Sequence, residues 1–288
     1  MFLLDPLPRA LTYLFIFASM LSIGLQTTRP GMLALFLDRR LLARSLAANF
    51  VLIPALGVLC ALFLPVSPEV GAAFVLLGCA PGGVSAIQFT GKVRGAAEVA
   101  GGMVFLLSIL AIPFTPLLIR LVLPDDVPVA VPYGRVFAFA ALFLVLPLFG
   151  GMLLRPLFGA WSARLSRPLA IVGTAAFAAV VGLIFGYRKQ AMSAIGAPAA
   201  GFMLLFVLTT MATGWLMGGP SRATRRVMAT TASMRNVALC LLLALSAFPG
   251  GSVQAPLVAF SALMIPPNLI FALYFLVRRG RKEDAIDE

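Results

Sequence analysis

Long apolar runs separated by short polar segments dominate the hydropathy pattern of this chain. A helix needs about 20 mostly apolar residues to cross a bilayer, so each run of that length is a candidate span. The pattern predicts nine spans, at residues 11–28, 42–64, 70–91, 96–122, 133–154, 168–187, 196–217, 223–248 and 254–277. We therefore predict an all-α polytopic membrane protein, a single transmembrane domain over residues 1–288 with a short tail at 279–288.

The composition supports this prediction and excludes several classes of protein. Hydrophobic residues make up 61% of the 288 residues and charged residues only 11%, whereas a soluble domain carries about 25% charged residues. The net charge of +12 does not indicate nucleic-acid binding, because the basic residues do not gather on one soluble face. Cys60, Cys79 and Cys240 are isolated within apolar runs, which is typical of small buried side chains.

The distribution of Lys and Arg predicts the orientation of the spans. Loops on one side of the predicted spans carry 16 of these residues, and loops on the other side carry five. Cytoplasmic loops are enriched in Lys and Arg, so we expect the N-terminus outside and the C-terminus in the cytoplasm. The size of the chain and its simple tail favour a prokaryotic inner membrane.

Pro81, Gly82 and Gly83 interrupt the third predicted span. Proline removes an amide donor and glycine is a weak helix former, so the helix is expected to break partway across the bilayer. The amides of Val84, Ser85 and Ala86 would then form the electropositive N-terminus of a half-helix, which suits an anion. Gln88, one turn further on, adds a polar side chain beside this break.

A second interruption, Ala232-Ser233-Met234-Arg235-Asn236, falls inside the eighth predicted span. Arg235 lies nine residues after Arg226, about 13 Å along a helix. A guanidinium at such depth costs on the order of 2.5–3.5 kcal/mol, so we expect it to have a specific partner: a substrate carboxylate or sulfonate, or free carbonyls. Similar proline spacing after both breaks predicts inverted repeats, the architecture in which transporters place sites at broken helices.

Polar residues in or beside the other spans complete the candidate site. Those that we expect near the breaks are Asn49, Thr231, Ser233, Asn236 and Asn268. Glu98 is an acidic residue near a span interior, interpreted either as a surface partner of Arg94 or as a proton-coupling carboxylate. The sequence contains no motif typical of nucleotide, zinc or hydrolase sites, so we expect no enzymatic activity and no cofactor.

The motifs together resemble the bile acid:sodium symporter family. The segments that carry the resemblance are Gly78–Gly83, Arg94-Gly95, Pro113–Leu117, Gly24–Thr27, Asn49–Pro54 and Met234–Asn236. The resemblance covers about residues 11 to 278 and implies inverted repeats, with two broken helices that cross in a core domain. It also implies a panel domain of spans one, five and six, against which the core moves. This chain would be a nine-span form of that fold.

The resemblance also shows where this chain departs from sodium-coupled members. Their Ser-Asn pair after Pro-Gly-Gly corresponds to Ala86 and Ile87 here, and their next Ser and Thr ligands correspond to Ala100 and Val104. The glutamate and glutamine of the late motif correspond to Thr231 and Arg235, and only the amide at Asn49 is kept. We therefore doubt that sodium binds, and we expect Arg235 to supply a fixed positive charge.

The resemblance implies secondary transport of an organic anion by alternating access, and the departures from the family pattern lead us to expect that this transport is not coupled to sodium. The anion would be a bile-acid-like amphipath or a small carboxylate or sulfonate, and the lipid bilayer would be the surrounding partner. Alternatives are a proton-coupled carrier that uses Glu98 and a binding or sensor protein that does not transport. A metalloid carrier is a further alternative, for which Cys79 would be the only support.

Overall fold

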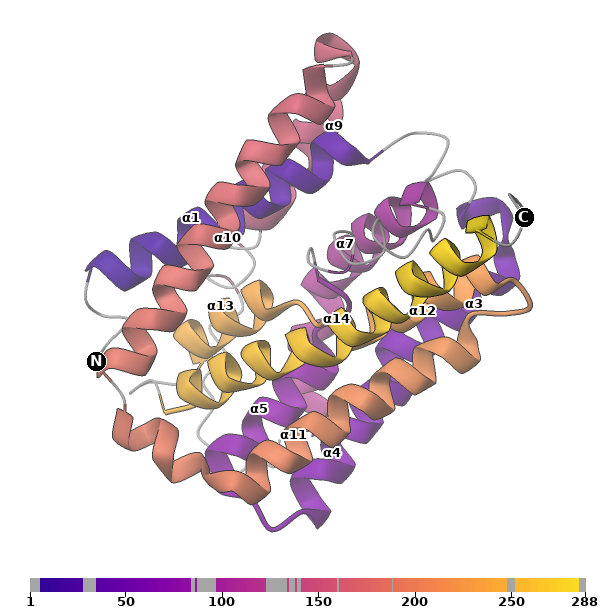
Figure 1. Cartoon of the computed structure of the whole chain (residues 1–288). Coiled ribbons are helices and arrows are strands. Elements are labelled where there is room, and N and C mark those ends of the chain that lie inside the picture. The colour runs from indigo at the N-terminus through magenta and orange to yellow at the C-terminus, as the bar shows by residue number, and fades with distance from the viewer. Residues whose placement is uncertain are drawn as a thin grey trace.

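The computed structural model describes residues 6–27, 35–83, 86, 97–122, 134, 138, 141–159, 161–187, 189–247 and 252–284. Apart from turns and short extended links, these residues are helical (Figure 1). The first half of the chain contains α1 (Pro6–Gln26), α3 (Arg39–Ala47), η2 (Ala48–Leu52), α4 (Ile53–Phe63), α5 (Pro68–Cys79) and α7 (Ala97–Val122). The second half contains η3 (Ala141–Val145), α9 (Leu146–Phe158), α10 (Trp161–Tyr187), α11 (Lys189–Met217), α12 (Arg222–Ser233), α13 (Val237–Ala247) and α14 (Gln254–Asp284).

Five helical segments within the described residues are long and apolar enough to cross a membrane. They are Arg39–Phe63, Ala141–Phe158, Trp161–Val180, Ile195–Met217 and Gln254–Phe275. Three shorter apolar segments, Ala10–Gln26, Pro68–Cys79 and Val99–Ala111, lie within α1, α5 and α7. The prediction of an all-α membrane protein is therefore confirmed, while the number of nine spans and the inverted repeats stay predictions.

Two helices contain a π-helical turn shortly before a proline. In the first, η2 (Ala48–Leu52) precedes Pro54, and in the second, η3 (Ala141–Val145) precedes Pro147. Proline lacks an amide donor, and its ring clashes with the carbonyl four residues earlier, so the helix widens locally. The first of these turns contains the buried Asn49, which it presents toward the helix breaks.

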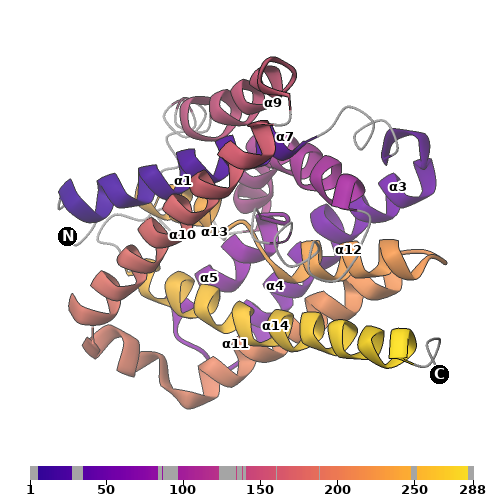
Figure 2. The ribbon, with the colours of Figure 1, turned by 45° about the horizontal axis from the view of Figure 1, so that its top comes forward.

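Three helices pack together as a group on one side of the molecule. The helix α1 packs along α10 and α9, and Figures 1 and 2 show α1 beside these two helices and away from α4 and α5. Gly24 of α1 and Gly151 of α9 allow close approach, because a Cβ on Gly24 would lie within van der Waals overlap of the Leu148 carbonyl of α9. This group consists of the helices from predicted spans one, five and six.

The remaining helices surround a buried aromatic cluster. Phe74 of α5, Phe206 of α11 and Phe260 of α14 have ring centroids 5.4 to 5.7 Å apart, and all three side chains are fully buried. Such ring pairs add about 0.5–1.5 kcal/mol each beyond their area of burial. The cluster fixes α5 against α11 and α14, and thereby positions the end of α5 at Cys79.

Several helix bounds differ from the predicted spans. The helix α10 begins at Trp161 rather than at 168 and includes Pro168, and α14 continues to Asp284, so that much of the predicted tail at 279–288 is helical. The helix α9 extends to Phe158, beyond the predicted end at 154. Hydropathy marks only the part of a helix that matches the hydrocarbon thickness, whereas a helix can continue into the polar interface.

Candidate functional site

Two helices end partway through the molecule, and their extended links lie side by side. The helix α5 ends at Cys79, and α12 ends at Ser233 before α13 begins at Val237. Between these links, Gly82 and Arg235 form an isolated antiparallel bridge. The Gly83 amide donates to the Met234 carbonyl over 2.7 Å, and the Asn236 amide donates to the Pro81 carbonyl over 3.1 Å. The two predicted interruptions therefore meet.

Glycine is required at this bridge because the two backbones approach closely. A Cβ on Gly83 would lie 2.8 Å from the Arg235 carbonyl oxygen and 3.0 Å from the Asn236 Cα. A Cβ on Gly82 would overlap the Thr231 carbonyl in the same way. Both obstacles are backbone atoms, which cannot rotate away as a side chain could. The Gly-Gly pair thus serves the contact between the links as well as the interruption of the helix.

The Arg235 side chain is buried beneath this bridge, with only 3% of its surface exposed. Its Nε donates to the Leu77 carbonyl and its Nη2 to the Gly78 carbonyl, both over 2.8 Å. Its Nη1 donates over 2.8 Å to the side-chain oxygen of Asn49 and over 3.4 Å to the Ala232 carbonyl. The guanidinium thus holds together α5, α12 and the π turn of η2.

The environment of this charge is favourable despite its burial. Leu77 and Gly78 lie in the last turn of α5, and Ala232 lies in the last turn of α12. The carbonyls at a helix C-terminus carry partial negative charge, so a cation that lies at two such ends is stabilised. Thr115 of α7 donates to the neighbouring Cys79 carbonyl over 2.8 Å. The terminal carbonyls of α5 therefore have side-chain partners although they are buried.

The other predicted polar residues take separate positions around the breaks. The side-chain oxygen of Asn236 accepts from the Leu239 amide over 3.1 Å and so caps α13, while its Nδ2 has no partner among the described residues. Ser233 donates to the Asn268 side-chain oxygen over 2.8 Å, which joins α12 to α14. Thr231 donates to the Val227 carbonyl within its own helix over 2.8 Å.

Some predicted site residues lie outside the described residues. Val84, Ser85 and Gln88 belong to this set, so the predicted half-helix after Gly83 stays a prediction. Glu98 is located in the first turn of α7, but its side chain is likewise outside the described part. The described site therefore consists of the first half of one broken helix and both halves of the other.

A comparison of the sequence with models of protein families finds a match. The sequence model of the sodium bile acid symporter family matches residues 13–195, more than half of the chain. The chain belongs to this family. A comparison with curated proteins found no match. Membership indicates an integral membrane protein that acts as a transporter. The match includes α5 and the Pro-Gly-Gly break, whereas Arg235 lies beyond the matched residues.

In this sodium bile acid symporter family member, the oxygens at the break already surround one cation, the Arg235 guanidinium. The Leu77, Gly78 and Asn49 oxygens each accept a hydrogen bond from it. Ala100 and Val104, which the resemblance matched to Ser and Thr ligands, carry no side-chain oxygen. A sodium ion placed among these oxygens would also face the positive guanidinium, which repels it.

The sequence analysis offered free carbonyls as partners of Arg235 but did not say which residues carry them. They are the Leu77 and Gly78 carbonyls, and the Met264 sulfur, which lies 3.4 Å from the Arg235 amide nitrogen, was not predicted at all. Backbone carbonyls occur at every position, so no residue type marks them. The only available signal was the end of α5 just before Pro81, which leaves the last carbonyls of a helix without partners.

Proposed function

We propose that this chain is a secondary carrier of an organic anion that works by alternating access without sodium coupling. The observation that carries the proposal is the contact of the Arg235 guanidinium with the Leu77, Gly78 and Asn49 oxygens at 2.8 Å. A cation attached to the chain stabilises the crossing at all times, whereas a free ion does so only when bound. Movement of the carrier then requires no ion from solution.

The proposed movement is of one group of helices against another. In this proposal α1, α9 and α10 form the panel, and the helices around the two breaks form the core. The packing of α1 along α9 and α10 supports this division. Because Arg235 bonds to α5, α12 and η2, the core would move as one unit. Inverted repeats and nine spans, with the N-terminus outside and the C-terminus in the cytoplasm of a prokaryotic inner membrane, belong to the same proposal.

The substrate would bind beside the bridge between the two links. Asn236 is 1% exposed and its Nδ2 lacks a partner among the described residues, and a buried amide of this kind calls for an acceptor. An anionic oxygen would accept from this amide, with the amides of Val84 and Ser85 as further donors. Arg235 uses most of its N–H groups on protein oxygens. It would therefore attract the anion mainly by its charge.

The test is uptake by proteoliposomes that contain the purified chain. The probes are taurocholate, a bile-acid-like sulfonate, and a set of small radiolabelled carboxylates, each measured in sodium chloride and in choline chloride. We expect uptake or exchange of at least one anion at the same rate in both media. A steep sodium dependence would overturn the proposal. Uptake that requires a pH gradient and disappears in Glu98→Gln would instead support proton coupling, and saturable binding without uptake would support a sensor.

A further inference from the structure

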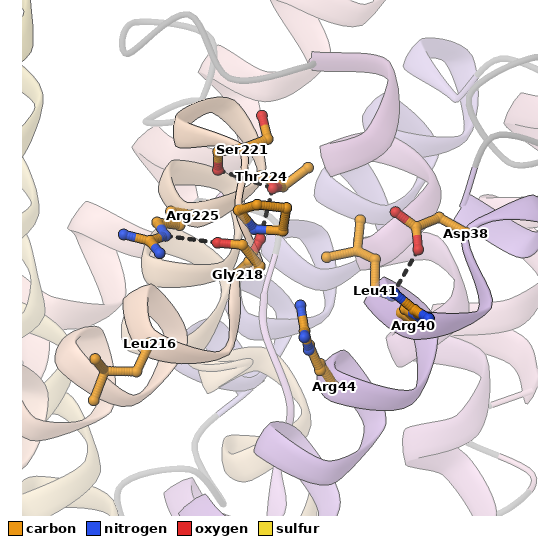
Figure 3. A pocket seen from close by; sticks show the side chains of 11 residues that line it. Asp38, Arg40, Leu41, Arg44, Leu216, Gly218, Ser221, Thr224 and Arg225 are labelled. Carbon is orange, nitrogen blue, oxygen red and sulfur yellow. Dashed lines mark hydrogen bonds between the residues drawn. The ribbon is translucent and has the colours of Figure 1, made fainter.

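A pocket of about 610 Å³ lies between the start of α3 and the loop from α11 to α12, and neither Gly82 nor Arg235 lines it. Three arginines line it: Arg40 and Arg44 from α3, and Arg225 from α12 (Figure 3). The acidic residue in the lining is Asp38, whose carboxylate accepts from the Leu41 amide over 2.9 Å and so caps α3. The pocket therefore has an excess of positive charge.

The guanidinium groups in this pocket retain free donors. Arg40 and Arg44 are exposed, and neither has a hydrogen bond or an ion pair within the described residues. Arg44 extends to the facing loop, where a Cβ on Gly219 would lie 2.8 Å from its Nη1. Arg225 donates through Nε to the Gly219 carbonyl over 2.6 Å, which orients its side chain along the loop. Figure 3 shows the Arg44 side chain between α3 and this loop, while the Arg225 guanidinium points away from Arg40 and Arg44.

Both helices that border the pocket carry basic residues where an anion would be favoured. The first turn of α3 contains Arg39 and Arg40, the first turn of α12 contains Arg222 and Arg225, and neither turn contains an acidic residue. A helix N-terminus carries partial positive charge, so arginines there repel it. The α12 N-cap residue Ser221 makes no side-chain capping bond. Asp38 already supplies a carboxylate at the start of α3, so a bound anion would relieve this repulsion mainly at the start of α12.

The surroundings of the pocket are those of a membrane interface. Trp215 of α11 stacks with Phe275 of α14, with ring centroids 6.1 Å apart. The Arg225 guanidinium lies 5.9 Å from the Trp215 ring, and that of Arg226 lies 4.1 Å from the Phe275 ring. Aromatic and basic residues gather at the level of the lipid headgroups. Leu216, 76% exposed, lines the same pocket and offers an apolar surface beside the charges.

We propose that this pocket binds the phosphate headgroup of an anionic membrane lipid. Arginine donors match phosphate oxygens in a bidentate manner, and basic pockets between membrane helices are suited to anionic headgroups. The exposed Leu216 would contact the acyl chain, which a soluble phosphate compound lacks. The bound lipid would join α3 to the α11–α12 loop. This inference is independent of the transported substrate and of Arg235.

The experiment is lipid binding to the purified chain in a neutral detergent, followed by native mass spectrometry and by the midpoint of thermal unfolding. The probes are phosphatidylglycerol, phosphatidylcholine and soluble glycerol 3-phosphate. The test variant is Arg40→Gln/Arg44→Gln. The matched control is Arg164→Gln/Arg167→Gln, which removes two exposed arginines of α10 that do not line the pocket. Arg44→Gln alone serves as a second variant should the double variant fail to fold.

We expect the wild type and the control to retain phosphatidylglycerol at least tenfold more tightly than phosphatidylcholine. The preference for phosphatidylglycerol should fall tenfold or more in the Arg40→Gln/Arg44→Gln variant and severalfold in Arg44→Gln. Equal affinity of the test variant and the control for phosphatidylglycerol would overturn the proposal. Saturable binding of glycerol 3-phosphate without a preference for phosphatidylglycerol would also overturn it, because the pocket would then serve a soluble phosphate compound.

Discussion

The Arg235 guanidinium donates to the side-chain oxygen of Asn49 over 2.8 Å, which joins residues 186 positions apart in the chain. Asn49 lies in the π turn before Pro54, and Arg235 lies in the link between α12 and α13. Both side chains are buried. The contact places a fixed charge among oxygens from three broken or distorted helices, α5, α12 and η2, and it gives the first prediction.

Replacement of Asn49 by Leu should destabilise the protein. Leu has a similar size but cannot accept a hydrogen bond from Arg235 Nη1. This nitrogen would then have only one acceptor, the Ala232 carbonyl at 3.4 Å. A hydrogen bond to a charged group contributes about 1.5–3 kcal/mol, so we expect a loss of about 2 kcal/mol in the free energy of unfolding. The measurement is reversible unfolding in detergent. Gln26→Leu, which removes an exposed amide on α1, is the control and should change this free energy by less than about 0.5 kcal/mol.

Gly83→Ala should disrupt the bridge between the two links. The added Cβ would lie 2.8 Å from the Arg235 carbonyl oxygen, and a backbone atom has little freedom to move. Overpacking of this kind costs about 1–3 kcal/mol. Gly201→Ala in α11 is the control, because a Cβ there meets no atom within 4 Å. Thermal unfolding should show a lower midpoint for Gly83→Ala only, and equal midpoints would refute the close contact.

Substitution by alanine at two adjacent glycines in α9 should change the stability of the protein in opposite directions. A Cβ on Gly151 would lie 2.5 Å from the Leu21 carbonyl oxygen of α1, whereas a Cβ on Gly150 meets nothing within 4 Å. Gly151→Ala should therefore separate α1 from α9 and destabilise the protein by about 1–3 kcal/mol. Gly150→Ala should stabilise it by up to about 1 kcal/mol, because alanine favours the helix. The same direction of change in both variants would contradict the packing of α1 on α9.

The double variant Thr231→Glu/Arg235→Gln should create a response to sodium. It removes the guanidinium from the Leu77, Gly78 and Asn49 oxygens and introduces a carboxylate, at the positions that correspond to the glutamate and glutamine of the family motif. Oxygen ligands with a carboxylate suit a hard cation. We expect sodium chloride to raise the unfolding midpoint of this variant relative to choline chloride. Arg235→Gln alone is the control, and an equal sodium response in it would show that the carboxylate has no role.

The breaks were predictable from the sequence because their signals are local. Pro81, Gly82 and Gly83 disfavour a helix wherever they occur, and the depth of Arg235 in its span already required a specific partner. The two alternatives left open for Arg235 were a substrate and free carbonyls. Its hydrogen bonds to Leu77 and Gly78 correspond to the second.

Other features depend on tertiary contacts that no local pattern reveals. The pairing of Gly82 with Arg235 requires two segments more than 150 residues apart to meet. The π turn before Pro54 was not predicted, and the inward direction of Asn49 follows from its contact with Arg235. The arginines of the lipid pocket come from α3 and α12, and in the sequence they appeared only as loop charges.

The most direct test of the central claim needs no knowledge of the substrate. A ligand that binds only the folded state raises its stability by about 2.7 kcal/mol at a concentration of 100 Kd. The measurement is a titration of the wild type with sodium chloride against choline chloride at constant ionic strength, followed by the midpoint of thermal unfolding. If Arg235 takes the place of the coupling cation, the two salts will give the same midpoint throughout. A saturable rise in the midpoint with sodium alone would contradict the account.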